Sequence, residues 1–181
     1  MMLIALALAA FGAETPLVTP ELTFGGGLGG GGGLEPGSGG GSAGIGGCWF
    51  PVGRVGFNLG VREGLWASPT RTVGEIDVGV RWRASASIDL LGGFVHHHET
   101  PWPDFLDDPT RSFLGVSPAI THRSGANFGV SWGKPVHTAD KLNVVFRVDG
   151  VVSALTGAGP VAYGQVDAGL WFEIPAIKRK E

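Results

Sequence analysis

The sequence contains a single cysteine, Cys48, among its 181 residues. One cysteine cannot close a disulfide within the chain, and it cannot build a cysteine-based metal site. Charged residues are also scarce, at 16 % of the chain, where about 25 % is typical. The 13 basic residues do not outnumber the 16 acidic ones. We therefore expect no nucleic-acid partner.

A long hydrophobic run is missing as well. The longest one, Met1 to Ala13, is shorter than the roughly 18–20 residues that a membrane-spanning helix needs. Hydrophobic residues still make up 43 % of the chain, which excludes a disordered protein. The 33 glycines follow no Gly-X-Y repeat, and glycine destabilises helix interiors. Two classes remain, a soluble all-β domain and a transmembrane β-barrel.

Residues 1–12 look like the apolar core of a secretory signal peptide. Ala10 and Gly12 are small residues at the positions that a signal peptidase reads, so we expect cleavage after Gly12. A short lead over residues 13–19 would then precede the folded domain. The alternative is a buried first strand or helix, because no Lys or Arg precedes the apolar run.

Segments in which apolar and polar residues alternate recur along the chain. In the clearest segment, Ile76 and Val78 fall on one face while Glu75 and Asp77 fall on the other, with the period of two that a strand requires. The pattern predicts eight strands, at about residues 20–30, 39–50, 55–65, 73–83, 87–99, 119–133, 141–153 and 162–172. They form one domain over residues 20–172, followed by a short charged tail over residues 173–181.

The connections between these strands fall into two sets that alternate along the chain. The longer set lies at about 31–38, 66–72, 100–118 and 154–161, and the shorter set at about 51–54, 84–86 and 134–140. Short turns on one side, longer loops on the other and an even number of strands are typical of outer-membrane barrels. We predict an all-β fold, an eight-stranded antiparallel up-and-down transmembrane β-barrel with a polar interior.

The polar faces of the strands carry charges of both signs. In a transmembrane barrel these faces point inward, where each buried charge needs a partner. Five arginines are set against five acids: Arg62, Arg81, Arg83, Arg123 and Arg147 against Glu75, Asp77, Asp89, Asp149 and Asp167. From these we predict an interior ionic network of Arg62, Glu75, Asp77, Arg81, Arg83, Arg147, Asp149 and Asp167.

Every strand that runs toward the short-turn side ends with an aromatic residue on its apolar face. These residues are Trp49, Trp82, Trp132 and Phe172. Aromatic rings anchor at a membrane interface, where one end of the side chain is dry and the other is wet. We therefore expect an aromatic girdle at this rim.

In pattern, strand number and terminal aromatic, residues 20–172 resemble the small eight-stranded outer-membrane barrels of the OmpA/OmpX type. The resemblance implies a bacterial outer-membrane location after export, with outer-membrane lipid and lipopolysaccharide as surroundings. It is a resemblance of architecture, and the members of such families include anchors, adhesion-related proteins and enzymes. An activity therefore does not follow from it.

The run His96-His97-His98-Glu99 lies at the loop end of the fifth predicted strand. Imidazole is a common ligand of zinc, copper and nickel, and alternation places His97 and Glu99 on one face, which makes them candidate metal ligands. The alternative is that His97 and Glu99 join the interior network. The loop that follows, at about residues 100–118, is the longest, and we expect any extracellular ligand to bind there.

His122-Arg123-Ser124 resembles, weakly, the His-x-Ser element of the outer-membrane lipid A 3-O-deacylases, which implies Ser124 as nucleophile and His122 as its base. The residue after Ser124 is Gly125, where that family has Asn. Alternation also places both residues on the lipid side, which suits a lipid substrate and equally a plain strand end.

We expect a barrel with a filled, non-porous interior, no cofactor, no catalytic residue beyond the candidates His122 and Ser124, and a structural or surface-interaction role. Two alternatives stay open. One is a lipid-modifying enzyme of the deacylase kind in the same fold. The other is a soluble barrel that binds an apolar ligand, as lipocalins do.

Overall fold

The computed structural model describes residues 21–33, 39–139, 141–158 and 161–175. The expected signal peptide, the lead over residues 13–19 and the end of the charged tail lie outside these residues. Neither of the helices within them is long and apolar enough to span a membrane.

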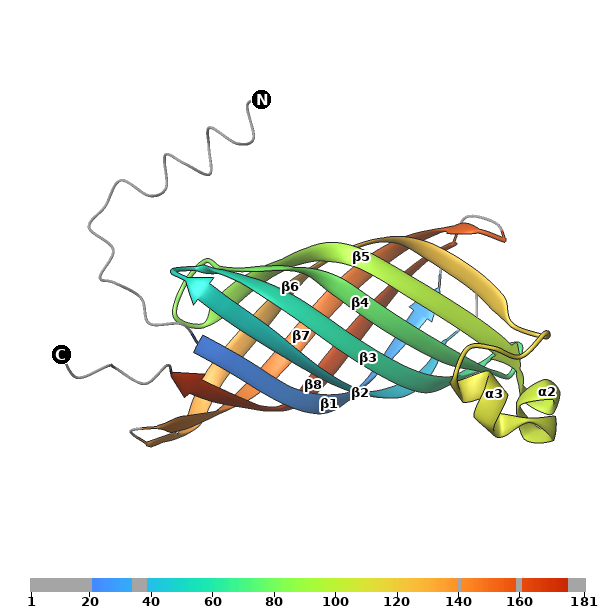
Figure 1. Cartoon of the computed structure of the whole chain (residues 1–181), viewed down its shortest axis with the longest axis horizontal. Helices are drawn as coiled ribbons and strands as arrows, with labels where there is room; N and C mark the ends of the chain where they lie inside the picture. Colours follow the sequence, from blue (N-terminus) through green and yellow to red (C-terminus); the bar gives the residue numbers. More distant parts are fainter. Residues whose placement is uncertain (1–20, 34–38, 140, 159–160, 176–181) are drawn as a thin grey trace, which may run out of the picture.

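Eight strands form a closed barrel, as the sequence pattern predicts. They are β1 (Glu21–Gly33), β2 (Gly39–Val52), β3 (Val55–Ala67), β4 (Arg71–Arg83), β5 (Ile88–Pro101), β6 (Thr121–Ala139), β7 (Leu142–Gly157) and β8 (Val161–Pro175). Each strand pairs antiparallel with the next, and β1 pairs with β8 to close the sheet. Figure 1 shows the strands tilted around one barrel, with the start of β1 and the end of β8 at the same end.

The strands are longer than predicted, and this shortens the connections. At the end that holds the start of β1, residues 53–54 join β2 to β3 and residues 84–87 join β4 to β5. We call this the short-turn end. At the other end, residues 68–70 form a tight connection, and residues 102–120 form the only long loop among the connections described in full. The predicted alternation of short and long connections is thus wrong at 66–72, because strand pairing continues into that gap.

At the short-turn end, β6 and β8 extend farthest past their predicted ends. The pairing of β6 with β7 continues to Ala139 through a bulge between Pro135 and His137, which accommodates a proline that cannot donate to the sheet. β8 runs to Pro175, so Glu173 pairs with Thr23 of β1 and Asn143 of β7. Glu173 therefore lies in the barrel wall. The prediction that a charged tail starts at residue 173 is wrong.

Apolar side chains are exposed on the outside of the barrel. Leu28 and Ile45 are each 73 % exposed, and Phe128 is 69 % exposed. Charged residues are buried on the opposite face of the same strands: in β4, Glu75 and Arg81 are buried, whereas Ile76, Val78 and Val80 between them are exposed. This is the alternation that the sequence predicts. It places the apolar face of the sheet on the outside.

Candidate functional site

Inward-facing charged residues are spread along strand β4, from one end of the barrel to the other. Glu75, Asp77, Arg81 and Arg83 follow one another on its buried face, from the long loop toward the short-turn end. Some of their partners come from strands that are not neighbours of β4: Arg81 pairs with an acid of β7, Arg83 pairs with an acid of β1, and Glu75 accepts a hydrogen bond from a tyrosine of β8. Contacts between such strands cross the inside of the barrel.

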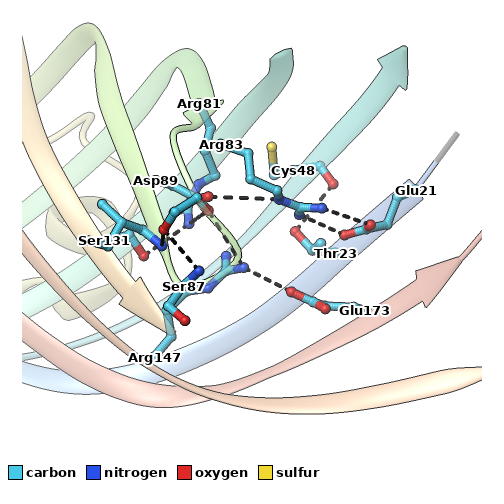
Figure 2. Close-up of polar contacts among 12 residues, drawn as sticks. Glu21, Thr23, Cys48, Arg81, Arg83, Ser87, Asp89, Ser131, Arg147 and Glu173 are labelled. Carbon is cyan, nitrogen blue, oxygen red and sulfur yellow. Dashed lines mark hydrogen bonds and ion pairs between the residues drawn. The ribbon is translucent and has the colours of Figure 1, made fainter. Parts of the chain in front are cut away.

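The first cluster lies at the short-turn end, where Asp89 is set among three arginines (Figure 2). One oxygen of Asp89 lies 3.2 Å from Arg81 Nη1 and 3.9 Å from Arg147 Nη2, and the other lies 3.8 Å from Arg83 Nε. Arg81 and Arg147 are each only 4 % exposed. Two buried positive charges and the half-buried one of Arg83 thus share this carboxylate.

Further acids complete this cluster. Arg83 Nη2 lies 2.9 Å from Glu21, and Arg147 Nη2 lies 3.1 Å from Glu173. Arg81 Nη2 is also 3.8 Å from Asp149. Of these acids, the predicted network contains Asp149 but neither Glu21 nor Glu173, because both lie at the ends of the predicted barrel segment.

Aromatic rings lie beside all three of these arginines. The guanidinium carbon of Arg147 lies 4.9 Å from the centre of the Trp171 ring, and that of Arg83 lies 4.4 Å from the Phe50 ring. Cation–π contacts of this kind stabilise a desolvated guanidinium. The sequence pattern places Trp171 on the polar face but does not indicate this role.

The second cluster surrounds Glu75, nearer the long loop. Arg62 Nη1 lies 2.8 Å from one Glu75 oxygen, and His97 Nδ1 lies 3.0 Å from the other. The hydroxyl of Tyr163 also donates a hydrogen bond to Glu75. Arg62 extends further to Asp167 of β8, so this cluster links β3, β4, β5 and β8. The structure thus brings Arg62, Glu75 and Asp167 together, all of them members of the predicted network.

His97 and Glu99, the candidate metal ligands, belong to this second cluster. His97 Nδ1 contacts Glu75, and His97 Nε2 lies 3.0 Å from Glu99. Glu99 also pairs with Arg71 at 3.1 Å and with Arg123 at 2.6 Å. Both ring nitrogens of His97 therefore already have carboxylate partners. Among the described residues, no group of three or more His, Cys, Asp or Glu side chains could hold a metal ion.

A cavity of about 90 Å³ separates the two clusters. Its lining includes Arg62 and Asp167 on one side and Arg81 and Asp149 on the other. Asp77, the remaining member of the predicted network, also lines the cavity and accepts a hydrogen bond from the Asn58 amide at 2.9 Å. A side chain at Gly60 would collide with the Asp77 carboxylate, so glycine makes room for this charge.

On the outer face, the predicted His122–Ser124 pair does not form. Ser124 Oγ instead lies 2.9 Å from Nδ1 of His96, and Nε2 of His96 lies 3.3 Å from Nδ1 of His122. The reason is the register of the sheet: Ser124 stands directly opposite His96 on the neighbouring strand, whereas residues i and i+2 on one strand are farther apart. The sequence predicts that these residues share a face, but not which imidazole contacts the serine.

His98 lies on the same outer face and is nevertheless buried. Its Nε2 lies 3.5 Å from Glu63, across Gly74 on the strand between them. Gly115, in the long loop, lies close to the same ring. The long loop therefore folds back over the outer wall at this point.

The long loop contains two short helices, α2 (Trp102–Asp107) and α3 (Pro109–Phe113), which Figure 1 shows beside the rim of the barrel. The ring of Trp102 stacks on that of Phe105, with 5.4 Å between their centres. Asp108 accepts a hydrogen bond from the backbone N–H of Arg111 and so caps α3. Four large apolar side chains of this loop are exposed: Leu106, Phe113, Leu114 and Val116.

The residues of the predicted aromatic girdle all lie toward the short-turn end. Trp49, Trp82 and Trp132 are exposed on the outside. Phe172 stacks on Phe24 of the neighbouring strand, with 5.4 Å between ring centres. The ring centres of Trp49 and Phe57 lie 6.5 Å apart, so aromatic contacts at this rim extend beyond the four predicted residues.

The same barrel is found in solved structures. Neisserial surface protein A matches with a TM-score of 0.55 at 10 % sequence identity, over 89 % of this chain and 99 % of that chain. The outer membrane protein OprG from Pseudomonas aeruginosa matches with a TM-score of 0.51 at 8 % identity, over 88 % and 98 % of the two chains. No protein-family model and no curated protein matches the sequence. The chain thus has the fold of the small eight-stranded outer-membrane β-barrels, as its sequence pattern predicts.

Proposed function

We propose that the protein is an integral barrel of a bacterial outer membrane with a closed interior. The observation that carries this proposal is the exposure of apolar side chains such as Leu28, Ile45 and Phe128 around the whole wall, combined with paired charges inside. A soluble protein rarely exposes a contiguous apolar patch larger than a few hundred Å². In a membrane, the same wall faces lipid, so its apolar side chains are not exposed to water.

The interior favours a closed barrel over a water-filled pore. An eight-stranded barrel is narrow enough for side chains to fill, and two ionic clusters lie in its path. At the long-loop end, Trp66, Val73 and Tyr163 belong to a buried apolar cluster as well. We therefore propose a structural or surface-interaction role and not transport through the barrel.

The proposed site of surface interaction is the long loop. Loops on a rigid scaffold are the usual place of recognition, and this one exposes Leu106, Phe113, Leu114 and Val116. His97 and Glu99 contact each other inside the barrel, near the end of β5 that leads into this loop. An extracellular ligand would meet these apolar side chains first.

The membrane location is tested by expressing the full chain with its N-terminal segment and separating the membranes on a density gradient. We expect the protein in the outer-membrane fraction, with the heat-modifiable gel mobility of a folded barrel, and no single-channel steps in planar bilayers. A protein that stays soluble without detergent would instead support the lipocalin-like alternative. Discrete conductance steps would contradict the closed interior.

A second candidate function is hydrolysis of acyl esters in lipid. Ser124 Oγ and His96 Nδ1 lie within hydrogen-bond distance on the outer face, where a lipid ester could reach them. Ser124 would attack the ester carbonyl while His96 takes the hydroxyl proton, and the bond to the alcohol would break as His96 passes this proton to the leaving alcohol oxygen. Water would then attack the acyl group on Ser124, with His96 again as base, and release the fatty acid. The test is release of fatty acid from lipid A by the refolded protein, with Ser124→Ala as the inactive control. No release by the unchanged protein would reject this function.

A further inference from the structure

Three imidazoles meet on the outer face of β5 and β6, close to the long loop. His98 stands directly opposite His122 in the register of the two strands, and His96 stands opposite Ser124. The rings of His96 and His122 stack with 5.4 Å between their centres, and the rings of His98 and His122 lie 6.4 Å apart. This group is separate from the second cluster inside the barrel, which contains His97.

The two nearest ring nitrogens have the spacing of metal ligands. His96 Nε2 and His122 Nδ1 lie 3.3 Å apart. Two imidazole nitrogens that bind one Zn²⁺ tetrahedrally, with bonds of about 2.0–2.1 Å, lie about 3.3 Å from each other. Small rotations of the two rings would direct both lone pairs at one ion. His122 is exposed, so an ion can reach it from solvent.

The surroundings prepare His96 for this role. A histidine that binds a metal usually donates the N–H of its other ring nitrogen to a neighbouring acceptor. Ser124 Oγ lies 2.9 Å from His96 Nδ1 and can accept this proton. The lone pair is then on Nε2, the nitrogen that faces His122.

We propose that His96 and His122 bind one divalent transition-metal ion at the outer rim of the barrel, with water completing the coordination. The expected ions are Cu²⁺, Ni²⁺ and Zn²⁺, which imidazole suits, and the usual order of stability favours Cu²⁺. The site uses two protein ligands, so it is consistent with the absence of a group of three or more ligands among the described residues. This site goes beyond the proposed structural or surface-interaction role, because it assigns metal binding to this rim of the barrel.

The test is calorimetric titration of each metal chloride into untagged, refolded protein in detergent. We expect saturable binding of one ion per chain, tightest for Cu²⁺. His122→Ala should weaken the binding at least about tenfold, because loss of a metal contact costs at least as much as loss of a supporting one. The matched control is His137→Ala, which removes an exposed imidazole from the opposite end of the same strand.

The outcomes separate the proposal from its alternatives. No saturable heat, or binding that His122→Ala leaves unchanged, would overturn it. An equal loss in the His137→Ala control would show binding without a defined site and would overturn it too. If His122→Ala does not refold, His122→Gln replaces it with the same expectation. Ser124→Ala separates this site from the hydrolase candidate, because it abolishes ester hydrolysis but only weakens metal binding.

Discussion

Asp149 and Asp167 stand directly opposite each other on β7 and β8, and both line the cavity inside the barrel. Two carboxylates in this relation repel each other. Each is offset by its own arginine, Arg81 for Asp149 and Arg62 for Asp167. Because these arginines belong to different clusters, the aspartate pair joins the two clusters across the cavity.

This relationship makes Asp149 far more replaceable than Asp89. We expect Asp89→Asn to lower the free energy of unfolding by about 3–5 kcal/mol, because it leaves buried arginines without a shared carboxylate. Asp149→Asn should change the free energy of unfolding by about 1 kcal/mol or less. The substitution removes the 3.8 Å contact with Arg81, but it also removes the repulsion from Asp167. The measurement is urea unfolding of each variant in lipid vesicles.

Both substitutions keep the size of the side chain, so each serves as the control for the other. Equal losses of stability would contradict the assignment of Asp89 as the centre of the short-turn cluster. A larger loss for Asp149→Asn would mean that the contact to Arg81 outweighs the repulsion between the two aspartates.

Tyr163→Phe tests the cluster around Glu75. The substitution removes the hydroxyl that donates to the buried Glu75 carboxylate and keeps the ring that packs edge-on against Trp66 at 5.7 Å. A hydrogen bond to a charged group contributes about 1.5–3 kcal/mol. We therefore expect Tyr163→Phe to lower the free energy of unfolding in vesicles by that amount. Tyr163→Ala, which also removes the ring, should cost clearly more. No loss for Tyr163→Phe would place the hydroxyl outside the network.

Much of the fold could be predicted because a strand has a strict period of two. The alternation around Ile76 and Val78 predicts the side of the wall for residues 75–83 of β4, and the exposure of these side chains agrees. Strand ends were predicted less well, as at Glu173, because pairing with the neighbouring strand continues past the alternating pattern. The helices α2 and α3 were not predicted, since each is only one to two turns long.

The site could be predicted only as far as the face on which each residue lies. Alternation identifies Arg62 and Asp167 as inward-facing, but it does not reveal that they meet across the barrel. That contact depends on the stagger of all eight strands. The same limit explains the serine contact, where Ser124 meets His96 on the neighbouring strand and not His122 on its own.

A charge on the outer wall should be costly in proportion to its depth in the membrane. Val78 pairs with residues in the middle of the neighbouring strands, whereas Val144 stands opposite Phe172 near the short-turn rim. We expect Val78→Arg to cost about 2–4 kcal/mol and Val144→Arg about 1 kcal/mol or less. The measurement is the unfolding free energy in vesicles. Equal costs, or none for Val78→Arg, would contradict the position of β4 in lipid.

The central claim is that the apolar wall faces lipid while the charged side of each strand faces inward. Trp132 is exposed on the outside, whereas Trp171 lines the inner cavity beside Arg147. The most direct measurement is tryptophan fluorescence of the folded protein in vesicles of lipid brominated near the headgroup end of its chains. We predict that Trp132→Phe removes part of the quenched fluorescence, and that Trp171→Phe leaves the quenched part unchanged. Loss of quenching with Trp171→Phe but not with Trp132→Phe would contradict the account.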